Sequence, residues 1–350
     1  MSYLPKPIKV ALVGTGYVAK QRVAALAEES DRAKLVAIAG RDRTSLQALC
    51  AISGARGTES WPELLQAPDI DLIIIATINS EHGAIAKAAI EADKHVICEY
   101  PLSLDPKEAQ IIINKARSRR KFLHIEHIEL LGGLHQTMGQ WLPQIGEVNY
   151  ARYITIKPKH PTPESWSYHP NFFGFPFSAA LSRIHRFTDL FGTVQSVSGR
   201  SRFWHLPESN PYYTACLCKA QLCFTNGLIA DVVYGKGDRF WQSTRTFELH
   251  GSQGTLIFST DKGELIRDKE TTPIEIGSRR GLFARDTILA LDSLLKDKPL
   301  YVSPTASHYA LVVADAIRQS TTTGRTIELQ DENNSPLSTI NYQLSTTNRS

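Results

Sequence analysis

The stretch IKVALVGTGYVA, residues 8–19, decides the fold of the N-terminal part of this chain. Its first six residues form an apolar run typical of a buried strand, and helical periodicity begins at its end. Between them lies a G-x-G-x-x-A motif, in which the first glycine permits a tight turn and the second lets a diphosphate approach the backbone. The helix that follows presents free N–H groups to that diphosphate. The dinucleotide site predicted by this motif contains Gly14, Gly16, Tyr17 and Val18.

Strand-like and helix-like segments alternate through the first third of the chain. After residues 8–13, short apolar runs recur at 35–39, 71–77, 95–99 and 122–127, with helical patterns between them. The run DLIIIAT, residues 71–77, is almost continuously apolar, as expected of a strand buried on both faces. This alternation predicts βαβ units and a doubly wound parallel sheet of the Rossmann type.

The pattern changes after about residue 146. Strand-like segments then follow one another at 147–156, 194–203, 213–224, 228–234, 244–250 and 254–259. Turn signals at Asn226-Gly227 and at 261–263 indicate hairpins, and helical patterns appear at 180–191, 284–295 and 307–320. We expect a nucleotide-binding Rossmann domain over residues 1–127, an α+β substrate domain with a large open antiparallel sheet over 128–330, and a flexible tail over 331–350.

Composition places the chain among ordinary globular proteins. Of its 350 residues, 42% are hydrophobic and 21% charged, and the net charge is +4. This small, dispersed charge does not favour a nucleic-acid partner, and no apolar run approaches the ~20 residues that cross a bilayer. Five cysteines and an N-terminus without a signal-peptide pattern favour a cytoplasmic location. No metal site is expected, because Cys216, Cys218 and Cys223 lack a fourth ligand and fit small residues on a strand.

The residues after the second strand bear on the choice of cofactor. Arg41 and Arg43 lie where an acidic residue would hold the ribose of NAD, and a guanidinium fork suits a 2′-phosphate. Asp42 could instead serve the ribose of NAD, and the two arginines could be solvated loop residues. We predict NADPH as the cofactor, with NADH as a weaker substitute.

Two later strand ends extend the predicted cofactor site. Ligands of open α/β sheets bind beyond the carboxyl ends of the strands, so the segments after residues 76 and 98 should line the crevice. The residues predicted there are Thr77, Asn79, His82 and Glu99. For Asn79 and His82, helix capping is the competing interpretation.

Three short motifs resemble those of the Gfo/Idh/MocA oxidoreductases. They are the glycine motif, a T-x-N-x-x-H segment at 77–82 and an E-x-P segment at 99–101, and the resemblance extends from residue 8 to about 330. Sugar dehydrogenases of that family carry Glu-Lys-Pro and then D-x-G-x-H-x-x-D, whereas this chain has Tyr100 for the lysine, Ser182 for the first Asp and Arg186 for the His. Tyrosine and arginine are poorly suited to take a proton from a sugar hydroxyl near neutral pH.

Longer segments resemble one branch of that family, the biliverdin reductases of the cyanobacterial type. The segments are CEYPLSL (98–104), LHIEHIELLGGLHQ (123–136), YARYITI (150–156), ALSRIHRFTDLFGTVQ (180–195), YGKG (234–237), HGSQGTLIF (250–258) and GSRRGLF (277–283). The resemblance implies NADPH-dependent reduction of biliverdin IXα to bilirubin, by hydride transfer to the central methine carbon. This substrate has no hydroxyl group to deprotonate, so the missing lysine and histidine are no objection.

The substrate residues are expected on the predicted helix at 180–191. Arg183 and Arg186 are three residues apart and therefore share a face, and Arg183 is the stronger candidate. Arginine is a poor acid, so its expected roles are to pair with a propionate, polarise lactam carbonyl groups or hold a water molecule. A surface salt bridge is the competing interpretation. Glu126 is a candidate proton source because burial would raise its pKa, and Tyr100 is a candidate contact to the nicotinamide or the pigment.

Two other functions are compatible with the sequence. One is another NAD(P)-dependent oxidoreductase of the same family with a sugar-like substrate, and the other is a non-enzymatic protein that binds NADPH or a tetrapyrrole. Alcohol-dependent reduction of NADP⁺ would favour the first, and NADPH binding without pigment reduction the second. The oligomeric state stays open, because an open sheet face can pair with another subunit or remain free.

Overall fold

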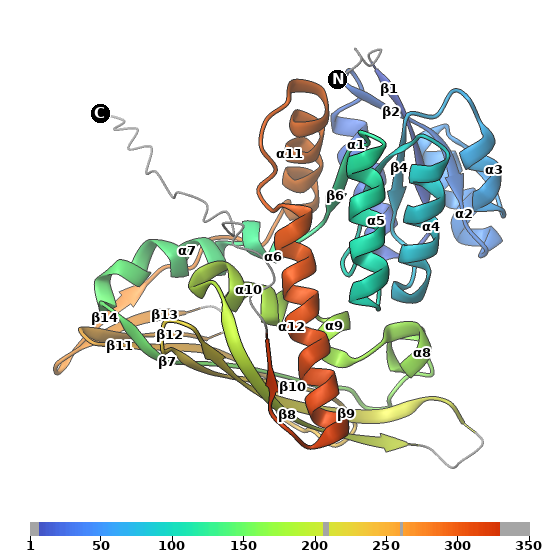
Figure 1. Ribbon diagram of the computed structural model, residues 1–350. Helices are drawn as coiled ribbons and strands as arrows, with labels where there is room; N and C mark the ends of the chain where they lie inside the picture. Colours follow the sequence, from blue (N-terminus) through green and yellow to red (C-terminus); the bar gives the residue numbers. More distant parts are fainter. Residues whose placement is uncertain (1–6, 206–209, 260–261, 330–350) are drawn as a thin grey trace, which may run out of the picture.

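The computed structural model describes residues 7–205, 210–259 and 262–329. The predicted tail and the start of the predicted turn at 261–263 lie outside these ranges. Two sheets organise the described residues, one of six strands and one of nine (Figure 1). No helix in these ranges is long and apolar enough to cross a membrane.

The six-stranded sheet is parallel and doubly wound, as predicted. Its strand order is β3-β2-β1-β4-β5-β6, which places β1 beside both β2 and β4. Every residue of β4 is buried, because helices cover both faces of the sheet (Figure 1). The strands are β1 (Ile8–Val13), β2 (Ala33–Ala39), β3 (Arg56–Thr58), β4 (Leu72–Ile75), β5 (His95–Cys98) and β6 (Leu123–Ile125). The helices are α1 (Tyr17–Glu28), α2 (Arg43–Ser53), α3 (Trp61–Gln66), α4 (Asn79–Glu91) and α5 (Pro106–Ser118).

The nine-stranded sheet is mostly antiparallel and has the order β14-β13-β12-β11-β7-β10-β9-β8-β15. It differs from the predicted antiparallel sheet in one pair, because β10 lies parallel to β7. The chain makes a long crossover through β8 and β9 before it returns beside β7, which permits a parallel pairing. The strands are β7 (Val148–Pro158), β8 (Val194–His205), β9 (Tyr213–Phe224), β10 (Ile229–Gly237), β11 (Thr244–Gly251), β12 (Gly254–Phe258), β13 (Gly263–Arg267), β14 (Glu270–Ile274) and β15 (Ile327–Glu328).

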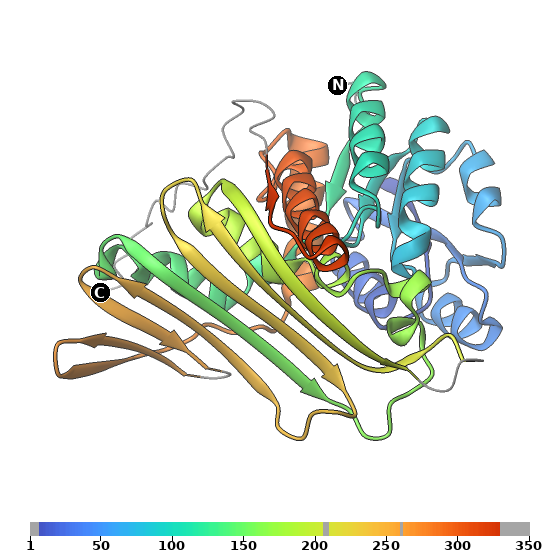
Figure 2. The same ribbon diagram turned by 60° about the horizontal axis from the view of Figure 1, so that its bottom comes forward.

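Helices cover the face of this sheet that looks toward the six-stranded sheet. Alternate residues of β7, namely Ala151, Tyr153 and Thr155, are buried, while the residues between them are partly exposed. Figure 2 shows the opposite face, where no described helix lies in front of the strands. The helical segments of this half are α6 (Ile128–Leu131), α7 (Gly133–Trp141), η1 (Leu142–Ile145), η2 (Trp166–Tyr168), α8 (Pro170–Phe173), α9 (Pro176–Ala179), α10 (Ser182–Phe191), α11 (Leu282–Lys296) and α12 (Pro304–Thr323).

The last two helices join the two halves of the molecule. Helix α11 packs on α1, and its Ala290, Leu291 and Leu294 belong to the apolar core beneath β1 and β2. Helix α12 packs on both α5 and β8. The chain after β14 therefore returns to the first sheet, so the domain boundary at residues 127 and 128 stays a prediction.

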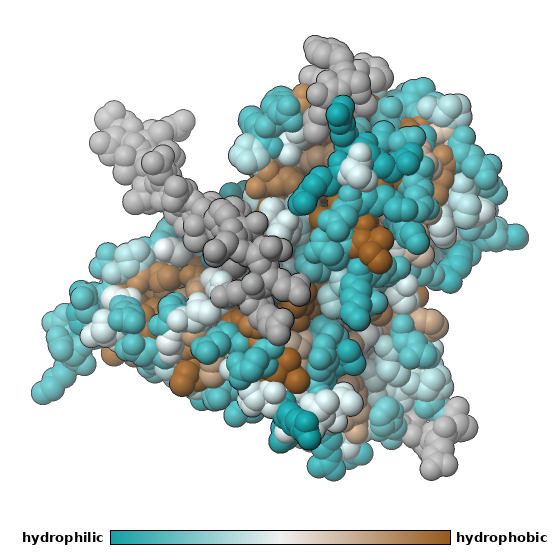
Figure 3. All heavy atoms as spheres, in the orientation of Figure 1, coloured by the Kyte–Doolittle hydropathy of each residue, from teal (hydrophilic) through white to brown (hydrophobic). Residues whose placement is uncertain are grey.

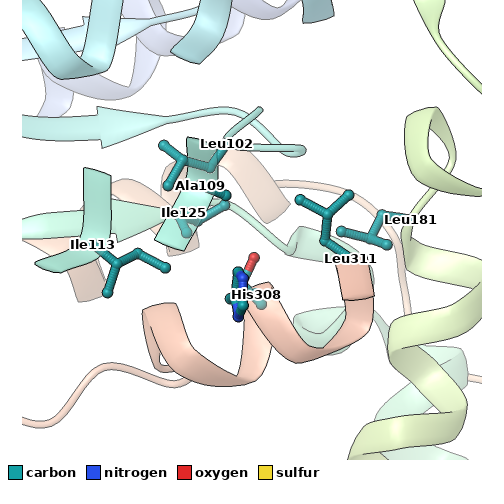
Figure 4. A pocket seen from close by; sticks show the side chains of 8 residues that line it. Leu102, Ala109, Ile113, Ile125, Leu181, His308 and Leu311 are labelled. Atoms are coloured by element: carbon teal, nitrogen blue, oxygen red, sulfur yellow. The ribbon is translucent and has the colours of Figure 1, made fainter. Parts of the chain in front are cut away.

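The junction of α5 and α12 contains a small apolar hollow, shown in Figure 4. Aliphatic side chains such as Leu102, Ile113 and Leu311 surround it, and the ring of His308 closes one side. The hollow is too narrow to admit a water molecule. We therefore interpret it as a packing defect between helices and not as a ligand site.

The glycine turn after β1 yields a test of the fold. Gly14 has a φ of 122°, and a Cβ atom there would lie 2.2 Å from the carbonyl oxygen of Ala76. We expect Gly14→Ala to lower the free energy of unfolding by about 1–3 kcal/mol, because the backbone would be strained.

Gly16→Ala is the matched control, because its Cβ would meet no atom within 4 Å. Its free energy of unfolding should change by less than about 1 kcal/mol. Urea denaturation followed by circular dichroism measures both variants. Equal stabilities would contradict the steric account of Gly14.

Candidate active site

The glycine turn leaves the N-terminus of α1 open. Gly16 immediately precedes α1, and the space its Cβ would occupy is empty. Tyr17 is exposed beside the ring of Phe283, and Val18 is partly buried. The backbone N–H groups of this turn can therefore approach a diphosphate closely, which fits a dinucleotide cofactor.

Two exposed arginines lie at the carboxyl end of β2. Arg41 forms an ion pair with Glu81 at 2.8 Å, and Arg43 pairs with Glu59 at 2.5 Å. Asp42 caps α2, and hydrogen bonds from Ser45 lower its pKa below the usual value. This carboxylate therefore already serves the helix, and contact of either arginine with a cofactor stays a prediction.

The loops after β4 and β5 are tied together by buried side chains. The Nδ1 atom of His82 lies 2.8 Å from the carbonyl oxygen of Pro101, and its Nε2 lies 3.3 Å from that of Thr77. Burial lowers the pKa of His82, which favours the neutral ring. Asn79 donates to the carbonyl oxygen of Phe173 in α8 at 3.0 Å.

These bonds decide one alternative for Asn79 and His82. The cap residue of α4 is Ile78, which makes no side-chain capping bond, so the helix-capping interpretation was wrong. Both side chains instead position the loops that line the crevice. Direct contact of Thr77, Asn79 or His82 with a cofactor stays a prediction.

A buried ion network joins α1, the end of β5 and α11. Arg22 on α1 donates to Glu99 at 2.7 and 2.9 Å and to Asp286 on α11 at 2.5 Å. Burial alone would lower the pKa of Arg22, but the carboxylates of Glu99 and Asp286 outweigh it and raise that pKa. Glu99 therefore has a structural role as the partner of Arg22, and it also lies at the end of β5. The sequence contained a signal for Arg22, because it lies on the same helical stripe as Val18 and Leu26.

Glu126 follows β6 and is hydrogen-bonded to Glu99. Burial first, and then repulsion from Glu99 and Asp286, raise the pKa of Glu126 well above its usual value. The predicted effect of burial on this carboxyl group is therefore confirmed. Burial thus favours the protonated form of Glu126, while Glu99 accepts hydrogen bonds from Arg22.

Tyr100 begins the loop after β5 and is stacked on His127. The two rings have centroids 5.2 Å apart and an interplanar angle of 7°. Burial, with a smaller contribution from Glu126, raises the pKa of Tyr100 to about 12. Its phenol thus keeps its proton and can donate a hydrogen bond.

The two predicted arginines of α10 both point into the protein. The guanidinium of Arg183 lies 4.6 Å from the ring centroid of Tyr234 on β10, and its buried Nε atom has no hydrogen-bond partner among the described residues. Arg186 is only 1% exposed and donates to Glu129 at 2.5 Å. Their shared face is confirmed, and the surface salt bridge was wrong because both side chains are buried.

Tyr153 and Tyr234 of the sheet also face this site, and no sequence motif had indicated them. Burial opposes ionisation of Tyr153, yet Arg186, Arg183 and Arg245 lower its pKa to about 8. The alternation along YARYITI was the available signal, since it places Tyr153 on the same face as Ala151.

Lys236 on β10 is held by aromatic rings. Its Nζ lies 3.7 Å from the ring centroid of Phe173 and 4.3 Å from that of Tyr168, and it donates to the carbonyl oxygen of Ser167. Burial lowers its pKa to about 8. Lys236 thus fixes α8 and its neighbouring turn against the sheet, and Asn79 holds the same segment from the other side.

The three cysteines that follow one another closely in the sequence lie on one strand. Cys216 and Cys218 are buried on β9, and Cys223 lies near the end of that strand. Their interpretation as small residues on a strand is confirmed. Among the described residues, no three His, Cys, Asp or Glu side chains form a group that could hold a metal ion.

Comparison with solved structures gives a match over nearly the whole chain. The biliverdin reductase of Synechocystis sp. PCC 6803, solved with biliverdin and NADP⁺, is 50% identical, with a TM-score of 0.88 over 90% of this chain and 99% of that one. A levoglucosan dehydrogenase solved with NADH and L-sorbose has a TM-score of 0.79 but only 18% identity, over 92% of this chain and 99% of that one. That second likeness shows the fold alone.

Curated relatives match over shorter regions. Mouse biliverdin reductase A is 27% identical over 57% of this chain and 63% of its own length. A dTDP-3,4-didehydro-2,6-dideoxy-α-D-glucose 3-reductase of Saccharopolyspora spinosa is 27% identical over 43% of this chain. That alignment spans 45% of the reductase, so the chain matches less than half of the length of this relative.

Two family models cover most of the chain. The NAD-binding Rossmann fold of the oxidoreductase family matches residues 8–127, and the C-terminal alpha/beta domain of the same family matches residues 143–329. The first range contains the glycine turn and its parallel sheet, and the second contains the nine-stranded sheet with Tyr153 and Lys236 and the covering helix α10 with Arg183. The chain therefore belongs to the Gfo/Idh/MocA oxidoreductase family.

Proposed function

We propose that this protein uses NADPH to reduce biliverdin IXα to bilirubin. The observation that carries the proposal is the 50% identity with the Synechocystis biliverdin reductase over 99% of that chain. The reaction adds a hydride to the central methine carbon and a proton to a pyrrole nitrogen, so it consumes one NADPH and one proton. When bound, NADPH supplies the hydride.

The residues of the first domain hold the cofactor in this proposal. The turn around Gly14 and Gly16 binds the diphosphate, and Arg41 and Arg43 meet the 2′-phosphate with charge-assisted hydrogen bonds. His82 positions the loops after β4 and β5. Five cysteines without a disulfide among the described residues suit a reducing cytoplasm, which we include in the proposal.

The residues of the second half hold the pigment. Arg183 presents an unpartnered Nε–H, and the adjacent ring of Tyr234 offers an aromatic face. Tyr100, with a pKa of about 12, donates a hydrogen bond and does not accept a proton near neutral pH. This property disfavours a sugar dehydrogenase, which needs a base at that position. Glu126 supplies or relays the proton in our proposal.

Replacement of Arg183 tests the substrate site. We expect Arg183→Ala to lower kcat/KM for biliverdin about 10- to 100-fold, because a buried charge-assisted interaction is lost. The decrease of the long-wavelength biliverdin band and the growth of the bilirubin band measure the rate. The Kd for NADPH should not change.

Arg202→Ala is the matched control for this variant, because its guanidinium also lies over an aromatic ring, 4.8 Å from the centroid of Trp204, but on an exposed part of β8. Its rate should equal that of the wild type. No spectral change with the wild type would refute the reductase proposal. Normal activity of a folded Arg183→Ala variant would remove Arg183 from the site.

The cofactor choice is tested at the end of β2. Arg41→Ala should raise the Kd for NADPH about tenfold and leave the Kd for NADH unchanged, because only NADPH carries the 2′-phosphate. Fluorescence titration measures both constants. Arg56→Ala serves as control, since Arg56 at the start of the neighbouring strand β3 is also an exposed arginine in an ion pair, with Asp69. Equal weakening of both cofactors would contradict the assignment.

Glu126 is tested by an uncharged substitute. Glu126→Gln keeps a neutral side chain beside Glu99, so the protein should fold. A proton donor acts in its protonated form, so wild-type kcat should fall as pH rises through the raised pKa of Glu126. The variant should have a lower kcat without that fall. Unchanged kcat and an unchanged pH profile, as expected for an exposed control such as Glu147→Gln, would exclude Glu126 as the proton source.

A further inference from the structure

One carboxylate in the second half of the molecule gathers three arginines. Glu129 on α6 pairs with Arg186 of α10 at 2.5 Å, with Arg245 of β11 at 3.4 Å, and with Arg279 from the segment between β14 and α11. We call these four residues the Glu129 cluster. Although Glu129 is largely buried, its guanidinium partners lower its pKa below the usual value.

The charges of the Glu129 cluster do not balance. Three guanidinium groups face one carboxylate, so two positive charges are uncompensated within the cluster. Asp189, the carboxylate of α10, already accepts from His135 at 2.7 Å. Arg186 is buried and paired with Glu129, whereas the side chains of Arg245 and Arg279 are 21% and 54% exposed, so the excess charge lies on the solvent side of the cluster. The excess therefore favours an anion that the chain itself does not provide.

Buried hydrogen-bond donors in and beside the cluster also favour a bound anion. The Nη1 atom of Arg186 is buried and has no hydrogen-bond partner among the described residues, and the same holds for Nε of Arg183, one turn earlier on α10. Buried polar atoms of this kind are normally satisfied. Exposure increases outward, because Arg186 is inaccessible while the side chain of Arg279 is 54% exposed. An anionic group that approaches from solvent would thus meet Arg279 first, with the unpartnered donors of α10 behind it.

We propose that the Glu129 cluster is the binding site for a propionate carboxylate of the tetrapyrrole. The inference rests on the proposed function, because it assigns one part of the proposed substrate, a propionate group, to this cluster. Glu129 keeps the three guanidinium groups in place when no pigment is present, and a second carboxylate then adds to a preformed site. Arginine forks match the planar geometry of a carboxylate and can bind it through two parallel hydrogen bonds.

The experiment compares biliverdin with its dimethyl ester, which retains the ring system but has no carboxylate. We expect Arg279→Ala and Arg245→Ala each to lower kcat/KM for biliverdin about tenfold, mainly through KM, and to leave the value for the ester unchanged. Arg280→Ala is the matched control, because Arg280 is an exposed neighbour that forms no ion pair with any described residue. It should act on both pigments as the wild type does.

The outcomes separate this inference from the proposed function. If the wild type reduces neither pigment, the proposed function fails and the inference fails with it. If the wild type reduces biliverdin but the variants lose activity toward biliverdin and toward its dimethyl ester in equal measure, only the inference is overturned. If Arg245→Ala does not fold, Arg279→Ala and Arg279→Glu decide the question. The charge reversal should reduce the use of the diacid further than the alanine does.

Discussion

A fully buried arginine is the constraint on which the arrangement of the crevice depends. Arg22 can lie inside the protein only because Glu99 and Asp286 surround it with negative charge. Glu99 ends the β5 segment and Asp286 lies on α11, so one side chain joins α1 to residues up to 264 positions away. Each of these ions would cost several kcal/mol to bury alone. The network therefore holds the glycine turn, the loop after β5 and α11 in one relative position.

The same network sets the protonation of its neighbours. Because Glu99 accepts from Arg22, it favours a proton on the adjacent Glu126, whose pKa is raised. Across the crevice, α10 brings Arg183 and Arg186 toward the sheet. The site thus has carboxyl groups at the ends of β5 and β6 and guanidinium groups of α10 beside the nine-stranded sheet. Such a division suits an anionic substrate that must gain a proton as well as a hydride.

The sequence predicted what periodicity and local motifs determine. The buried run of β4, the glycine turn and the shared face of the α10 arginines follow from spacing alone, and the structure agrees. Spacing does not determine partners, so the bonds of Asn79 to α8 and of His82 to Pro101 could not be foreseen. The parallel pairing of β10 with β7 was missed for the same reason. Strand pairing depends on where the chain returns after β8 and β9. The alternation of hydrophobic residues is the same in a parallel strand and in an antiparallel strand.

The departures from the sugar dehydrogenase pattern share one physical consequence, which concerns proton transfer. A dehydrogenase needs a group that releases its proton near neutral pH, so that it can later accept one from an alcohol. Tyr100 replaces the lysine and has a pKa of about 12, and Arg186 replaces the histidine and is committed to Glu129. Burial also raises the pKa of Glu126, so these positions favour keeping protons over removing them. Under the proposed function, the family scaffold is thereby adapted to reduction of a substrate without a hydroxyl group, for which retained protons are an advantage.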